Sequence, residues 1–216
     1  MKKTIGLVFI VCTFALCLLS ASFLWLDFRL ARSSTKVNAQ ASTYSIGIEN
    51  GSKLDPLDQL AIYIKGEDGF AAALRQQTIS KLDPNPEFGN ITSLEKHLDQ
   101  SDHPVLYVET QDRSIFWTPF FSRSRMTVYL AYATDGDISW RGKNDTVMHM
   151  QGSPAVRVES TYQVNDTTLG LVSRKAYQKF LAGQIAIKIS QTLGGSFTNP
   201  PMSESQGIWN ETTTQK

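Results

Sequence analysis

Residues 155–164, AVRVESTYQV, carry the clearest alternation of apolar and polar side chains in this chain. One side of the expected strand is apolar and comprises Val156, Val158, Tyr162 and Val164. The other side is polar and comprises Arg157, Glu159, Thr161 and Gln163. Because successive side chains of a strand point to opposite faces, the pattern predicts an antiparallel sheet with one dry face and one wet face.

The sequence before this stretch shows further extended patterns separated by turn residues. Asp135-Gly136 is a strong signal for a two-residue hairpin turn, with strands expected at 126–134 before it and 138–140 after it. The other expected strands are 105–109, 114–117, a weaker one at 147–150 and a short one at 44–48. The patterns together predict an antiparallel sheet of about four to six strands.

Helical patterns flank these strands on both sides. Asp55-Pro56 places a capping residue before a proline, and apolar residues follow with helical spacing through Ile64. Further helices are expected at 70–82, 93–99 and 173–193, the last ended by Gly194-Gly195. A sheet with one dry face needs a cover, so we expect an α+β domain with the helices packed on one face.

Residues 5–26 contain no charged side chain and would span roughly 33 Å as a helix, enough for a bilayer core. We interpret residues 1–28 as an uncleaved N-terminal transmembrane signal anchor. The alternative is a cleaved signal peptide, with a small-residue site ending at Ala41. Charge does not decide the orientation, because basic residues stand on both sides of the run: Lys2, Lys3, Arg29, Arg32 and Lys36.

Two further features suggest an exported domain. Five asparagines begin N-x-S/T triplets, which are acceptor sites for N-glycosylation: Asn50, Asn90, Asn144, Asn165 and Asn210. Both cysteines, Cys12 and Cys17, lie inside the apolar run, so the domain has no disulfide. This favours a bacterial or archaeal envelope domain over a small, disulfide-rich secreted module. We expect a single-pass protein of the cell membrane with an extracytoplasmic domain.

The chain divides into four segments by composition. The expected anchor at 1–28 is followed by a polar tether at 29–54 and a globular α+β domain at 55–195. Residues 196–216, with Pro200-Pro201 and several threonines, are expected to form a disordered polar tail.

No catalytic or cofactor-binding motif is found. The sequence has no G-x-S-x-G elbow, P-loop, G-x-G-x-x-G or C-x-x-C. We therefore expect a non-catalytic protein without a cofactor. Only one of the 20 acidic residues but five of the 21 basic residues lie at or beside the apolar run, so the rest of the chain is slightly acidic. A nucleic-acid partner is not expected for such a domain.

The three histidines do not predict a metal site. His97 and His103 are isolated, and His149 lies between Met148 and Met150. In a strand the two methionines would point away from the histidine, so one strand cannot offer all three to a copper ion. The acidic turn at Asp135-Gly136-Asp137 lacks the alternating oxygens of an EF-hand loop, so we interpret it as a hairpin tip.

Residues 115–126, IFWTPFFSRSRM, are the candidate partner or ligand surface. The residues we single out are Phe116, Trp117, Phe120, Phe121, Arg123 and Arg125. Pro119 marks the end of a strand, and adjacent rings must point to opposite faces. We favour rings covered by a helix, the tether or the tail. The alternatives are a groove for a partner or an apolar ligand, rimmed by the two arginines, and a loop that touches the membrane interface.

These features favour a membrane-anchored, extracytoplasmic, non-catalytic module. We expect an envelope accessory or assembly protein that binds another envelope protein. One alternative is a carrier of an apolar small molecule or lipid, held between sheet and helices. The least favoured alternative is an unrecognised hydrolase.

Overall fold

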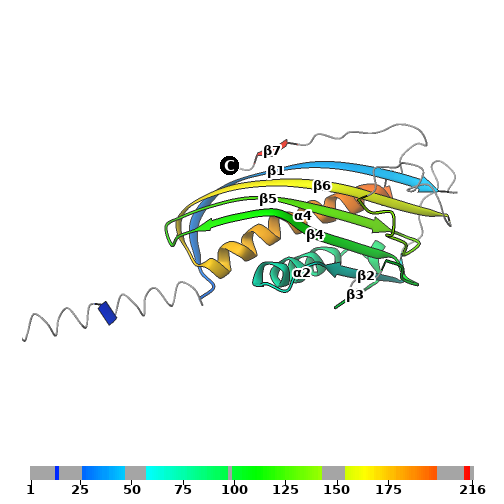
Figure 1. Ribbon diagram of the computed structural model, residues 1–216, viewed down its shortest axis with the longest axis horizontal. Helices are drawn as coiled ribbons and strands as arrows, with labels where there is room; N and C mark the ends of the chain where they lie inside the picture. The colour runs from blue at the N-terminus through cyan, green and yellow to red at the C-terminus, as the bar shows by residue number, and fades with distance from the viewer. Residues whose placement is uncertain are drawn as a thin grey trace, which may run out of the picture.

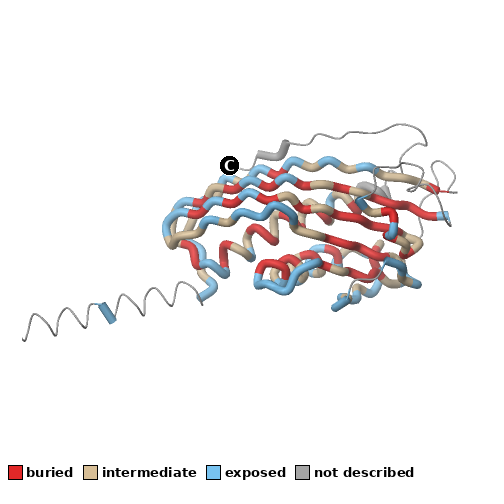
Figure 2. The backbone as a smooth tube through the Cα atoms, viewed as in Figure 1, coloured by how far each residue is buried: buried red, intermediate tan, exposed pale blue. Residues whose placement is uncertain are grey.

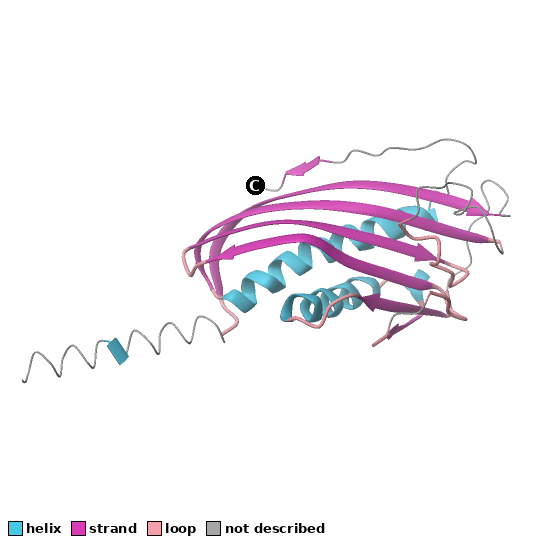
Figure 3. Ribbon diagram, viewed as in Figure 1, coloured by secondary structure: helices cyan, strands magenta, loops and turns pink. Residues whose placement is uncertain are grey.

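The computed structural model describes residues 13–14, 26–46, 57–96, 99–142, 154–198 and 212–214. A seven-stranded mixed sheet lies against two helices, both on the same face (Figures 1 and 3). The strand order across the sheet is β3-β2-β4-β5-β6-β1-β7. The α+β class and the helices on one face are confirmed. The sheet is mixed, however, because β2 pairs in parallel with both β3 and β4.

The strands are β1 (Arg29–Ile46), β2 (Gln59–Ile64), β3 (Asn90–Ser93), β4 (Val105–Trp117), β5 (Phe121–Ala133), β6 (Ala155–Val172) and β7 (Thr212–Thr214). The helices are α2 (Gly69–Leu82), the short 3-10 helix η1 (Pro86–Phe88) and α4 (Arg174–Thr198). The four long strands β4, β5, β6 and β1 are antiparallel to one another in that order. These four form the body of the sheet.

The alternation at 155–164 is confirmed and continues to the end of β6. Val156, Val158, Tyr162 and Val164 are all buried against the helices. We call the side of the sheet that meets the helices the inner face, and the opposite side the outer face. Beyond the predicted stretch the inner positions become polar, with Asp166 and Thr168 buried. The polar change hid nearly half of this strand, residues 165–172, from the sequence pattern.

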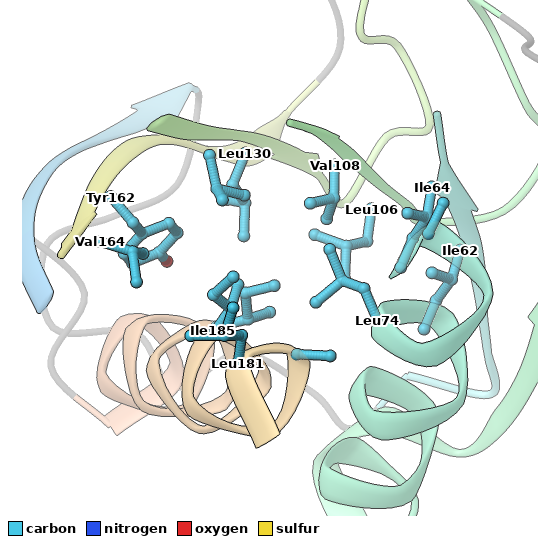
Figure 4. Packing of buried hydrophobic residues seen from close by; sticks show 14 of the residues in the cluster. Ile62, Ile64, Leu74, Leu106, Val108, Leu130, Tyr162, Val164, Leu181 and Ile185 are labelled. Atoms are coloured by element: carbon cyan, nitrogen blue, oxygen red, sulfur yellow. The ribbon is translucent and has the colours of Figure 1, made fainter. Parts of the chain in front are cut away.

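The main core fills the layer between the inner face and the two helices (Figure 4). α4 contributes a continuous buried stripe formed by Tyr177, Leu181, Ile185, Ile189 and Leu193. Side chains four apart lie on one face of a helix, which explains the stripe. Ser173 caps α4, because its hydroxyl accepts a hydrogen bond from the backbone N–H of Ala176. Asp68 caps α2 in the same way through the N–H of Ala71.

The expected tether is wrong for residues 29–46, which form β1. This strand pairs with β6 along its whole length, from Arg29 opposite Val172 to Ile46 opposite Ala155. Its composition is polar because it lies near the edge of the sheet, where backbone pairing to one neighbour supplies most of its contacts. The expected tail is wrong for Thr212–Thr214, which pair with β1 as β7. Of the rest of residues 196–216, only 196–198 are described, and they belong to α4.

The helices expected to begin at Pro56 and at Ser93 are also wrong. Residues 59–64 form β2. Most of its side chains are buried, and the buried ones include side chains from both faces of the strand. A short strand buried on both sides gives an unbroken apolar run, and such a run also satisfies helical spacing. Residues 90–93 form β3, a short strand beside β2. The helix expected at 70–82 is confirmed as α2.

Three smaller predictions also change. The strands expected at 105–109 and 114–117 are one strand, β4, with a bulge between Gln111 and Ser114. Residues 138–140 do not form a returning strand but pack on the outer face. α4 runs through Gly194-Gly195 to Thr198. The strand expected at 147–150 lies outside the described residues.

Most of residues 5–26 also lie outside the described residues; Thr13, Phe14 and Leu26 are the exceptions. Among the residues that are described, no helix has the length and apolar character needed to cross a membrane.

Candidate functional site

The outer face of the sheet has two ends with different surroundings (Figure 2). We call the end where β1 begins and β4 turns into β5 the proximal end; it lies at the left of Figure 1. The opposite end, where β5 ends and β6 begins, is the distal end. Apolar side chains reach the outer face at both ends, but only the distal ones are covered.

Three phenylalanine rings are exposed at the proximal end. Phe116 is 57% exposed, Phe120 67% and Phe121 37%. The rings of Phe116 and Phe121 contact each other, with centroids 6.1 Å apart. Among the described residues, no helix, tether or tail segment covers these rings as we expected, and all three are exposed.

Pairing across the sheet adds two leucines to these rings. Phe121 lies opposite Leu169 of β6, which is 61% exposed and lies in turn opposite Arg32 of β1. Leu30 is 75% exposed and also belongs to β1. We define the aromatic surface by the exposed apolar residues Phe116, Phe120, Phe121, Leu169 and Leu30. With strands about 4.8 Å apart, its members on β5 and β1 are roughly 10 Å apart.

Arginines stand beside this surface on the same face. Arg123 lies opposite Phe116, and Arg125 follows two positions along β5. Both are exposed, as is Arg32. Of the residues singled out from the sequence, the structure places Phe116, Phe121, Arg123 and Arg125 on one face of the sheet, with the exposed ring of Phe120 in the adjoining turn.

Trp117 does not belong to the aromatic surface. It packs against the main core, and its indole N–H donates a hydrogen bond to the carbonyl of Val172, with N and O 3.2 Å apart. Its neighbour Phe116 points outward, as expected for adjacent residues of a strand. Pro119 ends the strand as expected, and its carbonyl accepts a hydrogen bond from the N–H of Val172. Trp117 therefore holds the turn in place beneath the exposed rings.

The proximal end is also basic beyond the aromatic surface. Arg174 and Lys175 are exposed in the first turn of α4. Positive charge at a helix N-terminus opposes the helix dipole, so these residues do not serve the stability of α4. Arg29 lies over the ring of Phe180, 4.0 Å from its centroid. An anionic partner at this end would offset the unfavourable placement of these charges.

A buried carboxylate lies beneath the proximal end, on the inner face. Asp166 is 2% exposed and accepts hydrogen bonds from the hydroxyls of Thr35, Thr168 and Tyr177, with O–O distances of 2.6, 2.8 and 2.9 Å. Burial is the first cause that raises the pKa of Tyr177 above its ordinary value. These bonds join β1, β6 and α4, so we interpret the group as a structural network that fixes the start of β1.

The distal end has a second apolar cluster on the outer face. Its buried members are Ala61, Val105, Tyr107, Ala131, Ala133, Ile138 and Trp140. The segment 134–142 covers the sheet here and places Trp140 on it with 1% exposure. The indole N–H of Trp140 donates to the carbonyl of Asp137, with N and O 2.6 Å apart. The distal outer face is therefore a small core.

The acidic turn at the distal end holds a buried guanidinium. Arg157 is 1% exposed and donates to the carboxylates of Asp135 and Asp137, with N–O distances of 2.8 and 3.2 Å. The sequence already argued against a calcium-binding loop at this turn. The two carboxylates have a protein cation as their partner instead. The alternation in β6 predicts that Arg157 faces water. That pattern carries no information about the segment 134–142, which covers it.

Tyrosines and carboxylates surround the distal cluster. The hydroxyl of Tyr107 donates to Glu109, and that of Tyr129 donates to Glu159. Burial raises the pKa of both tyrosines, and the neighbouring carboxylates raise it further. Burial alone would also raise the pKa of Glu109, but hydrogen bonds from Lys65 and Tyr107 outweigh this and lower it. These groups form satisfied pairs and do not resemble an acid–base site.

The described residues do not assemble a metal site. They contain no cluster of three or more histidine, cysteine or acidic side chains that could hold a metal ion. His103 is exposed near the distal end, while Asp166 lies at the proximal end. About eleven positions along the strands, roughly 36 Å, separate them, so these two side chains do not act together. His97 and the Met148–Met150 stretch lie outside the described residues.

Two of the five N-x-S/T asparagines are described. Asn90 and Asn165 are both exposed, the first in β3 and the second on the outer face of β6. Asn50, Asn144 and Asn210 lie outside the described residues.

Sequence reasoning missed Leu30, Arg32 and Leu169. The first two were assigned to the tether, and Leu169 lay beyond the end of the expected strand. A signal was present for Leu169, since the alternation of β6 continues with Thr167 and Leu169 outward. The pairing that brings β1 beside them is long-range and has no local signature.

No family model matches this sequence, and no curated protein matches it. Among solved structures, the chain is similar to the PelC dodecamer from Paraburkholderia phytofirmans, with TM-score 0.34, 13% identity, and coverage of 67% of this chain and 94% of that chain. A single-residue variant of that dodecamer gives TM-score 0.31 and 10% identity, over 67% and 93% of the two chains. A neuraminyllactose-binding hemagglutinin homologue from Helicobacter pylori gives TM-score 0.31 and 9% identity, over 69% and 90%. Similarity this weak defines no function.

Proposed function

We propose that this protein is a membrane-anchored, extracytoplasmic, non-catalytic module that binds another envelope protein. Residues 5–26 form its anchor, and the α+β domain carries the binding surface. The observation that carries the proposal is the direct connection between the apolar run and β1.

Only Asp27 and Phe28 separate the apolar run from the first residue of β1. The backbone of Phe28 is itself held, because its carbonyl accepts from the N–H of Ser173 and its N–H donates to the Ser173 hydroxyl. At about 3.5 Å per residue, Arg29 then lies within roughly 10 Å of the end of the membrane span. The domain is thus held at the membrane surface.

The position of β1 also favours an uncleaved anchor. Cleavage after Ala41 would remove Arg29–Ala41, most of a strand that pairs with β6. Ala41 itself lies opposite Ser160 in that pairing. A protease would have to act before the strand folds, and the product would lose the start of the sheet.

The long edge of β1 supports the binding of a partner by strand addition. β1 has 18 residues, and β7 pairs with only Lys36, Val37 and Asn38. Among the described residues, the remaining length of this edge has no neighbouring strand. Edge strands with free backbone groups are templates for an added strand of a partner.

The alternative of an apolar-ligand carrier has less support. Its expected site is the layer between sheet and helices, and that layer is occupied by the main core, including Leu74, Leu106 and Leu181 (Figure 4). A ligand there would have to displace well-buried side chains.

Topology can be measured first. A single cysteine at Ser205→Cys, with Cys12→Ala and Cys17→Ala, is treated with a membrane-impermeant maleimide in cells whose outer barrier is opened. We expect labelling of the full-length chain without lysis. Labelling only after lysis would overturn the extracytoplasmic assignment, and a labelled band shorter by about 41 residues would overturn the uncleaved anchor.

Partner binding can be measured by site-specific photo-crosslinking in cells. A photoreactive residue at Gln40, on β1, is compared with one at Gln76, an exposed position of α2. We expect a discrete adduct from Gln40 and none from Gln76. An adduct of twice the chain mass would identify a second copy as the partner, and identical patterns from both positions would contradict strand addition.

A further inference from the structure

We propose that the aromatic surface at the proximal end docks on the membrane from which the anchor emerges. Its rings and leucines would lie in the interfacial layer, and the arginines beside them would bind anionic lipid headgroups. The proposal rests on the anchor at residues 5–26 in the proposed function and adds a second contact with the same membrane.

The first argument is position. Leu30 belongs to the aromatic surface and is the second residue of β1, four residues after the end of the apolar run. Phe121 and Leu169 lie within two strand spacings of β1, roughly 10 Å. Because so few residues separate the apolar run from β1, the chain holds this surface close to the bilayer.

The second argument is chemistry. Phenylalanine and leucine side chains with more than half of their surface exposed are unfavourable in water, and Phe116, Phe120, Leu30 and Leu169 all exceed that fraction. Apolar and aromatic side chains next to basic ones are typical of surfaces that bind the membrane interface. Arg32, Arg123 and Arg125 supply the basic side chains on the same face.

The third argument is charge at the rest of the proximal end. Arg174 and Lys175 are exposed in the first turn of α4, where the helix dipole disfavours them. The acidic residue Asp27 at this end is paired with Lys179, N–O 3.2 Å. A lipid surface bearing anionic headgroups would attract each of these free positive charges.

The fourth argument is the contrast with the distal end. There the apolar residues of the same face are covered by the chain's own segment 134–142. At the proximal end the described chain supplies no such cover, and the nearest extended apolar phase is the bilayer that holds the anchor. A membrane therefore fits this surface better than a protein partner, which would have to enter between the domain and the lipid.

The proposal can be tested with the full chain reconstituted in vesicles of phosphatidylcholine with phosphatidylglycerol. In a Cys12→Ala, Cys17→Ala background, a nitroxide label is attached at Phe120→Cys or at Gln163→Cys. Gln163 is the matched control, because it is exposed on the outer face of β6 but lies away from the aromatic surface. Collision of each label with oxygen, which concentrates in lipid, is compared with collision with a water-soluble nickel complex.

We expect the label at 120 to favour oxygen over nickel by several-fold relative to the label at 163. The ratio should fall when phosphatidylglycerol is omitted and when Arg123→Gln and Arg125→Gln are combined. A label at 120 with the same ratio as the label at 163 would overturn the proposal. A label shielded from both reagents would also overturn it, because a protein then covers the surface.

A separate readout distinguishes this failure from failure of the anchor. Vesicles are washed with alkaline carbonate and floated on a density gradient. If the chain stays with the vesicles but the label at 120 is exposed to water, membrane docking is overturned and the anchor is not. Loss of the chain from the vesicles would overturn the anchor and, with it, the docking that depends on the anchor.

Discussion

The two ends of the outer face share the long strands β4, β5 and β6 and reach opposite outcomes. At the distal end Trp140 covers the sheet, and an arginine, Arg157, is buried with two aspartates. At the proximal end Phe120 is 67% exposed, and Arg123 and Arg125 stand in water. Figure 2 shows this change along β4 and β5. Strand alternation alone would treat both ends as the same wet face.

The difference teaches that apolar residues on the outer face need a cover, and that the described part of the chain supplies one only at the distal end. The segment 134–142 can reach the distal end because it follows β5 directly. The turns at the proximal end are short, since only Thr118, Pro119 and Phe120 join β4 to β5. The proximal end must therefore be covered from outside the described chain or remain exposed, which is the basis of the docking proposal.

The largest expected effect is the loss of Arg157. Arg157→Ala leaves Asp135 and Asp137 without their buried partner, and we expect it to lower the free energy of unfolding by about 3–5 kcal/mol. Arg125→Ala, on the same face at the exposed end, should change it by less than about 0.5 kcal/mol. Urea denaturation measures both. Equal effects would mean that the two ends do not differ energetically.

A second prediction compares two neighbours in β6 that point to opposite faces. Asp166→Ala leaves three hydroxyls without their acceptor, two of them on the buried residues Thr168 and Tyr177, and should cost about 1–3 kcal/mol of stability. Asn165→Ala removes an exposed side chain from the outer face and should change stability by less than about 0.5 kcal/mol. If hydrogen exchange at the start of β1 stayed unchanged in Asp166→Ala, the network would not be fixing that strand.

The aromatic surface should show a small coupling energy in a double-mutant cycle. Phe116 and Phe121 contact each other, so the cycle to alanine should give a coupling of about 0.5 kcal/mol. The matched cycle of Phe116 with Leu30, three strands away, should give none. Zero coupling in both cycles would indicate that the rings do not form an ordered surface.

The smallest expected effect is a dependence of stability on acid pH at the distal end. The pKa of Glu109 is lowered in the folded protein, so its contribution is complete above the ordinary value of 4.5 and is lost as the pH falls through the lowered value. The Lys65 side chain is more than half exposed, so water screens the pair and the contribution should be no more than about 0.5 kcal/mol.

Lys65→Met should reduce the loss of stability between pH 7 and pH 3 relative to the unmodified chain. Lys81→Met, at an exposed lysine of α2, controls for the lost charge. Thermal unfolding followed by circular dichroism at both pH values measures the difference. An identical pH dependence in all three chains would contradict a contribution from this pair.

The sequence by itself determined the elements whose patterns are strong and local. The alternation of β6, the helix at 70–82 and the capping serine of α4 were all readable, because each depends on residues close together in the chain. The aromatic segment was readable for the same reason: its rings and arginines lie within about a dozen residues. The class, α+β with helices on one face, followed from these elements.

Only the tertiary structure decided how distant segments cover one another. It placed a polar stretch expected to be a tether as β1 beside β6, since backbone hydrogen bonds need no apolar signature. It buried Arg157 beneath Trp140, although the strand pattern predicts that Arg157 faces water, and it left the ring of Phe120 exposed. Exposure depends on which segment lies above a residue, and that is fixed by long-range pairing and not by local sequence.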